Sequence, residues 1–93
     1  MLIMSGTMRE TRGEIKPQRV YRDYMGRLYY VENISEGFID KEKIVVFREG
    51  FPPYKIYHLP YEIFAETLPQ SMREECLVKY GTMPQYRFEE LSY

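Results

Sequence analysis

Alternating apolar and polar positions near the start of the chain predict an antiparallel hairpin. Residues 19–24 and 27–33 each mix tyrosine and aliphatic residues with charged ones, and Gly26 lies between the two segments. Glycine readily takes the backbone angles of a tight connection, so the two segments are expected to pair around it. Because side chains alternate between the two faces of a strand, Tyr29 and Tyr30 point to opposite faces. At least one of the two rings is therefore expected to stay partly exposed.

Two further strands follow a predicted loop at residues 34–42. Residues 43–49, KIVVFRE, combine β-branched and aromatic side chains with a charge at both ends, a pattern that predicts a strand in the centre of a sheet. Residues 50–54, GFPPY, predict a turn, because the two prolines cannot donate to a strand ladder. Residues 54–59 alternate again and predict a fourth strand, which Pro60 stops.

A short helical turn is predicted next, at residues 60–68. Proline is tolerated in the first turn of a helix, and the sequence PYEIFAETL begins with one. In this conformation Ile63, Phe64 and Leu68 are able to face the core. A helix this short needs tertiary support, so packing must hold it in place.

A longer helix is predicted at residues 72–80, before a last strand at residues 85–91. Ser71 and Glu74 have the spacing of a capping box, in which each side chain bonds a free backbone N–H of the first turn. Gly81 fits the left-handed position that ends many helices. The segment QYRFEEL then returns to alternation and closes the predicted set of strands.

These elements predict a mainly β fold. About five short strands, tight turns, a short helical turn and one helix in the C-terminal half describe a small, strongly bent antiparallel barrel, since one flat sheet of this size leaves its apolar face uncovered. Residues 1–14 follow neither hydrophobic period and predict a mobile tail, whereas residues 15–93 predict a single domain.

The segments IKPQRVYRDYMGRLYYV, KIVVFRE and LPYEIFAE fit one known pattern in register and without a gap. Through them, residues 15–66 resemble domain-of-unknown-function family 1653 of bacteria and phages, and YRFEEL is similar to that family's closing strand. The resemblance implies a small SH3-like barrel and carries no settled biochemical role. The matching residues are Pro17, Tyr21, Arg22, Gly26, Tyr29, Val31, Val45, Val46, Phe47, Arg48, Pro60 and Phe64.

The chain departs from the family's pattern mainly at polar positions. Asp23 replaces a histidine, Met25 replaces a lysine, residues 37–40 replace a His-Ser-Glu-Thr loop, and Leu59 replaces an arginine. The scaffold positions are kept while these polar positions change. A divergent member of the family is therefore expected to bind a different ligand, or to bind the same ligand differently.

Charge and composition narrow the function classes. The net charge of −1 argues against a non-specific binder of duplex DNA, which needs many phosphate contacts. Residues 1–31 nevertheless carry six basic and three acidic residues, which allows a local basic face. No apolar run approaches the ~20 residues that span a bilayer. One cysteine makes no internal disulfide, so we expect a cytoplasmic protein without a membrane partner.

Catalytic and metal chemistry have little support in the sequence. His58 and Cys76 are the only pair suited to nucleophilic catalysis, and a strand histidine with an apolar helix cysteine is the simpler interpretation. The acidic residues Glu36, Asp40 and Glu42 lack the spacing of a hard-cation site. We therefore expect a protein that is not an enzyme and that holds no metal and no cofactor, and hydrolase-type chemistry by His58 and Cys76 is the one catalytic alternative left open.

Tyrosine is the anomaly of the composition, with ten residues against no tryptophan. Exposed tyrosine and arginine side chains suit the stacking of bases and the binding of phosphates. The first hypothesis is a non-catalytic module for a nucleotide-like ligand or single-stranded nucleic acid, which in a phage would sequester a nucleotide signal. The residues expected to contact the ligand are Tyr21, Arg22, Tyr30, Arg48 and Tyr57.

Two alternatives stay open at this point. The tyrosines also suit cross-strand packing, and a tyrosine-rich face with the helix at 72–80 suits a protein partner or a homo-oligomer. Arg22 and Arg48 also suit ion pairs with Asp23, Glu32 or Glu49. Exposure and partners of these side chains decide between the hypotheses.

Overall fold

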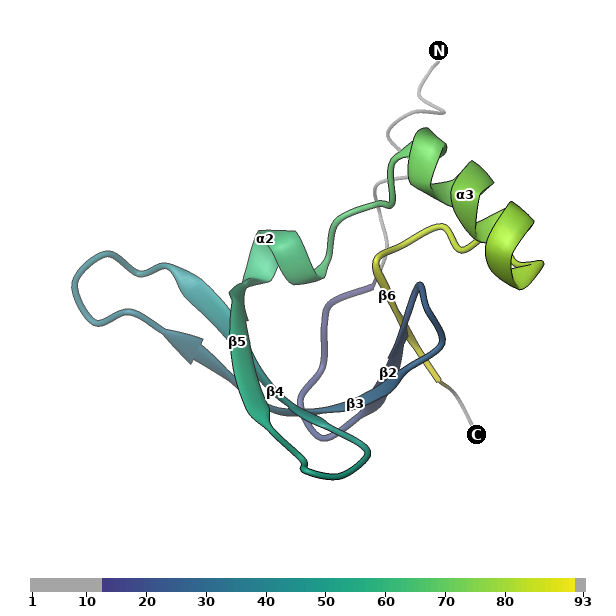
Figure 1. The fold of residues 1–93 in the computed structure, drawn as a ribbon. Helices are drawn as coiled ribbons and strands as arrows, with labels where there is room; N and C mark the ends of the chain where they lie inside the picture. The colour runs from purple at the N-terminus through teal and green to yellow at the C-terminus, as the bar shows by residue number, and fades with distance from the viewer. Residues whose placement is uncertain (1–12, 92–93) are drawn as a thin grey trace, which may run out of the picture.

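Five antiparallel strands form one sheet, which confirms a mainly β fold. The structure, a computed structural model, describes residues 13–91, so most of the tail predicted at 1–14 lies outside the described residues. The strand order is β5-β4-β3-β2-β6, and the last strand in sequence therefore joins the first (Figure 1). Closure of this sheet into a barrel stays a prediction. The strands are β2 (Val20–Asp23), β3 (Leu28–Glu36), β4 (Lys43–Glu49), β5 (Ile56–Pro60) and β6 (Phe88–Glu90).

The β2–β3 hairpin forms around Gly26 as predicted. Gly26 has a φ of 92°, a region that favours glycine, and its N–H donates to the carbonyl of Asp23 at 3.0 Å. The N–H of Asp23 donates to the carbonyl of Arg27 at 2.9 Å and closes the turn. In the paired strands Tyr29 is buried and Tyr30 is partly exposed, which confirms the split between the two faces.

The loop predicted at residues 34–42 was too long, because β3 continues to Glu36. The register of β3 against β4 shifts between Val31 and Asn33, so a bulge moves the inward positions by one residue. Ile34 consequently packs against the core, although it breaks the alternation that precedes it. Because of the bulge, a simple period of two does not predict this part of the strand.

Strand β4 matches its prediction at residues 43–49 and lies inside the sheet rather than at its edge. It pairs with β3 on one side and β5 on the other. Because β6 adds on the far side of β2, the middle of the sheet is β3. The predicted turn at residues 50–54 separates β4 from β5, which includes Pro60 as its last residue.

The core lies on one face of the sheet and is rich in aromatic rings. Phe64 and Phe88 stack with parallel rings at a centroid distance of 4.1 Å, and Phe47 contacts both edge-on. Such pairs add to the stabilisation that burial alone provides. The buried members of this cluster are Ile15, Tyr21, Tyr29, Val31, Val45, Phe47, Phe64 and Phe88.

The short helix α2 (Tyr61–Phe64) follows β5 directly and covers the core. Pro60 is its N-cap residue rather than its first helical residue. Phe64 and Leu68 are buried as predicted, whereas Ile63 is 41% exposed, which corrects its predicted core position. Helix α2 spans little more than one turn, so it presents only a narrow stripe to the core.

Helix α3 (Gln70–Tyr80) begins earlier than predicted and lacks the predicted capping box. Pro69 is the N-cap residue and makes no side-chain cap bond, so Ser71 falls inside the first turn. Glu74 instead accepts a hydrogen bond from the side chain of Gln70 at 3.1 Å. Gly81 has the predicted left-handed conformation, with a φ of 74°.

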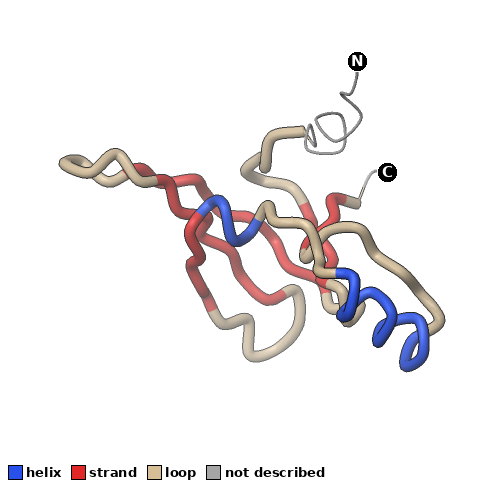
Figure 2. Tube along the Cα trace, turned by 90° about the horizontal axis from the view of Figure 1, so that it is seen from above, coloured by secondary structure: helices blue, strands red, loops and turns tan. Residues whose placement is uncertain are grey.

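The two ends of the molecule differ in shape. In Figures 1 and 2 the β3–β4 hairpin projects away from the other strands, and α3 lies at the opposite end of the molecule. Cys76 is the buried residue of α3, and its thiol lies 3.8 Å from the carbonyl of Tyr24 in the β2–β3 turn. No helix in residues 13–91 combines the length and apolarity needed to cross a membrane.

Candidate functional site

The five residues predicted to bind a ligand do not form one site. Tyr21 pairs with Tyr29, and Tyr57 pairs with Phe47, on neighbouring strands. Cross-strand partners share a face, so Tyr21 and Tyr57 lie on the core side of the sheet. The remaining three, Arg22, Tyr30 and Arg48, lie on the other face. A ligand on either face therefore contacts only part of the predicted set.

Tyr21 is a core residue, which corrects its prediction as a ligand contact. Its exposed fraction is 1%, and its ring packs edge-on against Phe64 at 5.4 Å. Its hydroxyl accepts a hydrogen bond from the backbone N–H of Lys16 at 2.9 Å. Because the ring is enclosed by α2 and the sheet, no ligand can stack on it.

On the outer face, Arg48 is already paired with a carboxylate. Its Nη2 atom lies 2.8 Å from Oε2 of Glu32, which confirms the ion-pair alternative for this arginine. The guanidinium also lies 5.6 Å from the ring centre of Tyr30, its cross-strand neighbour. Glu32 offsets the positive charge, so this cluster is a weak site for an anion.

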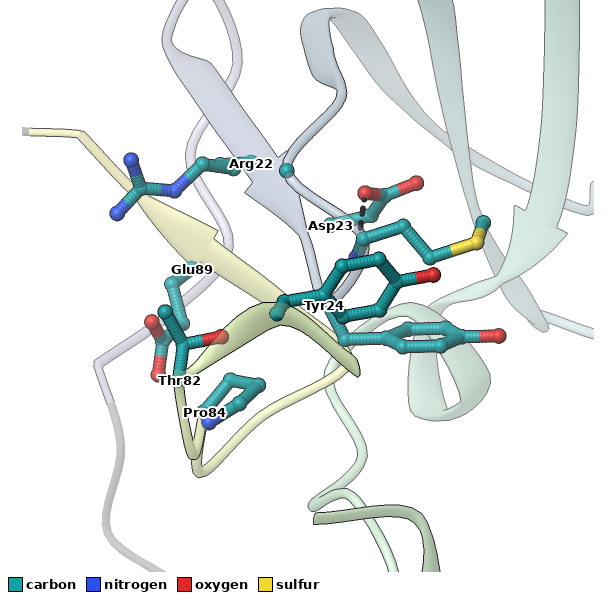
Figure 3. A pocket seen from close by; sticks show the side chains of 9 residues that line it. Arg22, Asp23, Tyr24, Thr82, Pro84 and Glu89 are labelled. Atoms are coloured by element: carbon teal, nitrogen blue, oxygen red, sulfur yellow. Dashed lines mark hydrogen bonds between the residues drawn. The ribbon is translucent and has the colours of Figure 1, made fainter. Parts of the chain in front are cut away.

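Arg22 lies in a different place, at a cleft between the β2–β3 turn and the segment after α3. This cleft has a volume of about 200 Å³, and Glu89, the cross-strand neighbour of Arg22 on β6, shares it. Figure 3 shows the Arg22 side chain extending away from the ring of Tyr24. Arg22 and the ring of Tyr24 therefore do not converge here on one ligand position.

A second cleft is open and contains aromatic rings, as the predicted ligand site requires. It is an open depression of about 240 Å³ with a mostly apolar lining. Both edge strands of the sheet contribute to it, β5 from one side and β6 from the other. We call it the aromatic cleft, and it is lined by Tyr29, Phe47, Tyr57, His58, Leu59 and Phe88.

Tyr57 is the accessible ring of the aromatic cleft. It is 40% exposed, and its ring lies 5.8 Å from that of Phe47 with the two planes tilted by 33°. Its hydroxyl donates to Oε2 of Glu49 at 3.1 Å, and that hydrogen bond raises its pKa. The bond holds the ring against the wall of the cleft, with the apolar face beside Phe47.

Arg27 does not line the aromatic cleft, but it affects the pKa of two tyrosines that do. Burial and then the negative charge of Asp23 raise the pKa of Tyr29, whereas the Arg27 side chain opposes both effects. Arg27 also opposes the rise in the pKa of Tyr57. Its guanidinium is therefore close enough to influence both hydroxyl groups. Among residues 13–91, no carboxylate lies within ion-pairing distance of Arg27.

Asp23 fixes the backbone that carries Arg27. Oδ1 of this buried carboxylate accepts hydrogen bonds from the backbone N–H groups of Met25 at 3.0 Å and Arg27 at 2.8 Å. Two charge-assisted bonds of this kind hold the turn in one conformation. Asp23 thus has a structural role in this chain.

The structure does not bring His58 and Cys76 together. His58 lies on β5 and is exposed, whereas Cys76 is buried in α3 against the carbonyl of Tyr24. Within residues 13–91, no three side chains of the His, Cys, Asp and Glu types are grouped so as to hold a metal ion. The absence of enzymatic activity stays a prediction.

Sequence reasoning identified one wall of the aromatic cleft, Tyr57, and missed the others. Phe47 and Phe88 looked like ordinary strand residues, and only the return of β6 beside β2 brings Phe88 near them. Arg27 could have been identified from the sequence, because it directly follows the turn residue Gly26 and therefore lies at the end of the hairpin.

Comparison with protein-family models, with curated proteins and with solved structures gives no match. The resemblance of residues 15–66 to family 1653 therefore stays a prediction.

Proposed function

We propose that this chain is a non-catalytic binding module that holds a planar ring of an anionic ligand in the aromatic cleft. The ligand class is a nucleotide or single-stranded nucleic acid, with the base beside Tyr57 and a phosphate near Arg27. The observation that supports this proposal is an open aromatic cleft with a nearby arginine, Arg27, that forms no ion pair within residues 13–91. Stacking of a base on an aromatic side chain contributes about 1–3 kcal/mol.

The dimensions of the cleft favour one ring over a larger molecule. Pockets that enclose a drug-sized ligand usually have volumes of about 300–1,000 Å³. The aromatic cleft, at about 240 Å³, fits a single base and leaves the rest of a nucleotide in solvent. One arginine then contacts one phosphate, which agrees with the net charge of −1 and argues against a long charged track.

This proposal replaces the earlier set of contacts with a smaller one. Tyr57 is kept from the prediction, Tyr21 is excluded by burial, and Arg48 is offset by Glu32. Arg27 takes the role first expected of Arg22 and Arg48. A module without catalytic groups acts by holding its ligand, and sequestration of a nucleotide signal is the form of this function that we propose.

Thermal unfolding in the presence of mono-, di- and cyclic nucleotides tests the proposal. A ligand that binds the native state raises the melting temperature, so at least one nucleotide at millimolar concentration is expected to do so. Tyr57→Ala and Arg27→Gln are expected to reduce the shift. Tyr80→Ala is the matched control, since Tyr80 is 49% exposed and lies outside the aromatic cleft.

Each outcome of this experiment tests a different part of the proposal. Equal shifts for the Tyr57 and Tyr80 variants would move the ligand to another surface. The absence of any shift for the unmodified chain with every nucleotide would refute the ligand class. A retained shift in Arg27→Gln, with a lost shift in Tyr57→Ala, would show that the cleft takes an uncharged aromatic group.

A second candidate function is protein interaction through helix α3. This helix buries Cys76 but leaves apolar side chains in solvent, with Val78 86% and Leu77 50% exposed. Exposed apolar groups of this kind commonly mark contact surfaces. Sedimentation velocity of Val78→Ser beside the unmodified chain tests this candidate, which predicts that the substitution weakens any association.

A further inference from the structure

The tip of the β3–β4 hairpin exposes two large apolar side chains that pack against nothing else in the sheet. Phe38 and Ile39 are each 90% exposed, the highest values among the large apolar residues of residues 13–91. The hairpin carries them away from the other strands, as Figures 1 and 2 show. Because the two side chains are adjacent in sequence and exposed together, they form a candidate contact surface.

The tip is an ordered turn, so its two apolar side chains are held in place before any contact forms. The N–H of Gly37 donates to the carbonyl of Glu42 at 2.8 Å, and the N–H of Lys41 donates to the carbonyl of Gly37 at 3.0 Å. Oδ1 of Asp40 accepts from the N–H of Glu42 at 3.0 Å. An ordered contact segment loses little conformational freedom on binding, which favours affinity.

Backbone conformation at the tip supports the same conclusion. Lys41 has a φ of 60°, a left-handed conformation that is uncommon for a residue with a side chain. Its ammonium group lies 5.5 Å from the ring centre of Phe38. Conformations of this kind persist only where surrounding bonds hold them, and they concentrate at functional segments.

The chain also contains a surface that suits this tip. The aromatic cleft is apolar, open and, at about 240 Å³, large enough for one aromatic side chain. The hairpin end at residues 36–43 carries three acidic residues and two lysines, so its charge is nearly balanced. The match between tip and cleft is therefore in size and apolar surface.

The tip cannot reach the cleft of its own molecule. Tyr29 lines the cleft and pairs with Glu49, whereas Glu36, at the other end of β3, pairs with Lys43 beside the tip. At ~3.3 Å per residue, the ordered strand separates the two by roughly 20 Å. Only a second molecule can bring a tip to the cleft.

We propose that the Phe38–Ile39 tip of one copy docks into the aromatic cleft of a second copy. The contact joins two different surfaces, so it forms a closed ring, a reciprocal pair or an open chain according to the angle between copies. Tip and ligand occupy the same cleft under this proposal. A nucleotide that binds there is expected to disperse the assembly, but the self-association does not depend on any ligand.

Sedimentation velocity of the full chain over a range of concentrations tests the proposal. The unmodified chain is expected to sediment faster as its concentration rises toward about 1 mM, the range of weak specific contacts. Phe38→Ser combined with Ile39→Ser is expected to remove this dependence, and so is Tyr57→Ala. Met83→Ser is the matched control, because Met83 is 48% exposed and lies outside both the tip and the aromatic cleft, and it is expected to leave the association unchanged.

A mixture of the tip variant and the cleft variant gives the strongest test of the proposed contact. The tip variant keeps its cleft and the cleft variant keeps its tip, so a mixture of the two is expected to recover association that neither shows alone. Circular dichroism of each variant confirms that it is folded, and the exposed tip substitutions should leave the melting temperature unchanged.

Several results would overturn the proposal. A chain that stays monomeric throughout, a tip variant that associates normally, or loss of association in Val78→Ser alone each contradicts it. Binding of the unmodified chain but not the tip variant to phosphatidylserine vesicles, without self-association, would make the tip a membrane contact instead. Failure of the nucleotide experiment with retained association would remove the proposed ligand and leave this contact in place.

Discussion

Replacing Asp23 tests whether one buried carboxylate holds the β2–β3 turn and, with it, the position of Arg27. Oδ1 of Asp23 accepts the backbone N–H groups of Met25 at 3.0 Å and Arg27 at 2.8 Å. Asp23→Ala removes the acceptor of both bonds. Asp23→Asn keeps one side-chain oxygen in the same place and removes the charge.

The expected loss follows from these two bonds. A hydrogen bond to a charged group contributes about 1.5–3 kcal/mol, and a neutral one about 1 kcal/mol. Met25 and Arg27 are exposed, so water replaces part of what their N–H groups lose. We expect Asp23→Ala to lower the free energy of unfolding by about 2 kcal/mol and Asp23→Asn by about 1 kcal/mol.

Urea unfolding measures both losses. With a slope of about 1 kcal/mol per molar urea, the midpoint should fall by about 2 M in Asp23→Ala and about 1 M in Asp23→Asn. Asp40→Ala is a suitable control, because Asp40 accepts one exposed backbone bond, from Glu42. Midpoints that coincide for the alanine and asparagine variants, or an alanine variant within about 0.5 M of the unmodified chain, would refute the turn-holding role of the Asp23 oxygen.

Two further predictions concern the aromatic core. Phe64→Ala should lower the free energy of unfolding by about 3–5 kcal/mol, because Phe64 is fully buried and stacks on Phe88; a loss below about 2 kcal/mol in urea would show that the cluster relaxes around the cavity. Burial raises the pKa of Tyr29 above 10.0, so the folded state keeps this proton longer than the unfolded state does. The resulting stabilisation is complete below pH 10.0 and is lost as the pH rises through the folded pKa. Alkaline unfolding of Tyr29→Phe should therefore depend less on pH, and identical profiles would contradict the assignment.

Strands with regular alternation were easier to predict from the sequence than a strand with irregular pairing. The hairpin at Gly26 and the strand at 43–49 followed from local pattern, because a period of two and a glycine turn are properties of adjacent residues. The end of β3 did not, since the bulge after Val31 reverses which positions face inward. The predicted capping box failed because Pro69 starts α3 before Ser71 is reached.

The candidate site was less predictable than the fold. Alternation showed correctly that Tyr29 and Tyr30 face opposite sides, but it assigned no side to the interior. Tyr21 became a core residue because α2 brings Phe64 against its ring. Arg48 lost its predicted role because Glu32 lies within 2.8 Å across the sheet.

The sequence by itself determined that this chain forms mainly strands, that its first hairpin turns at Gly26, and that some tyrosine rings lie on its surface. These properties depend on neighbouring residues, and backbone geometry fixes them locally. Only the tertiary structure decided which rings share a cleft. Residues as distant as Tyr29 and Phe88 meet because β6 pairs with β2 at one edge of the sheet while β5 forms the other, and no local pattern encodes that pairing.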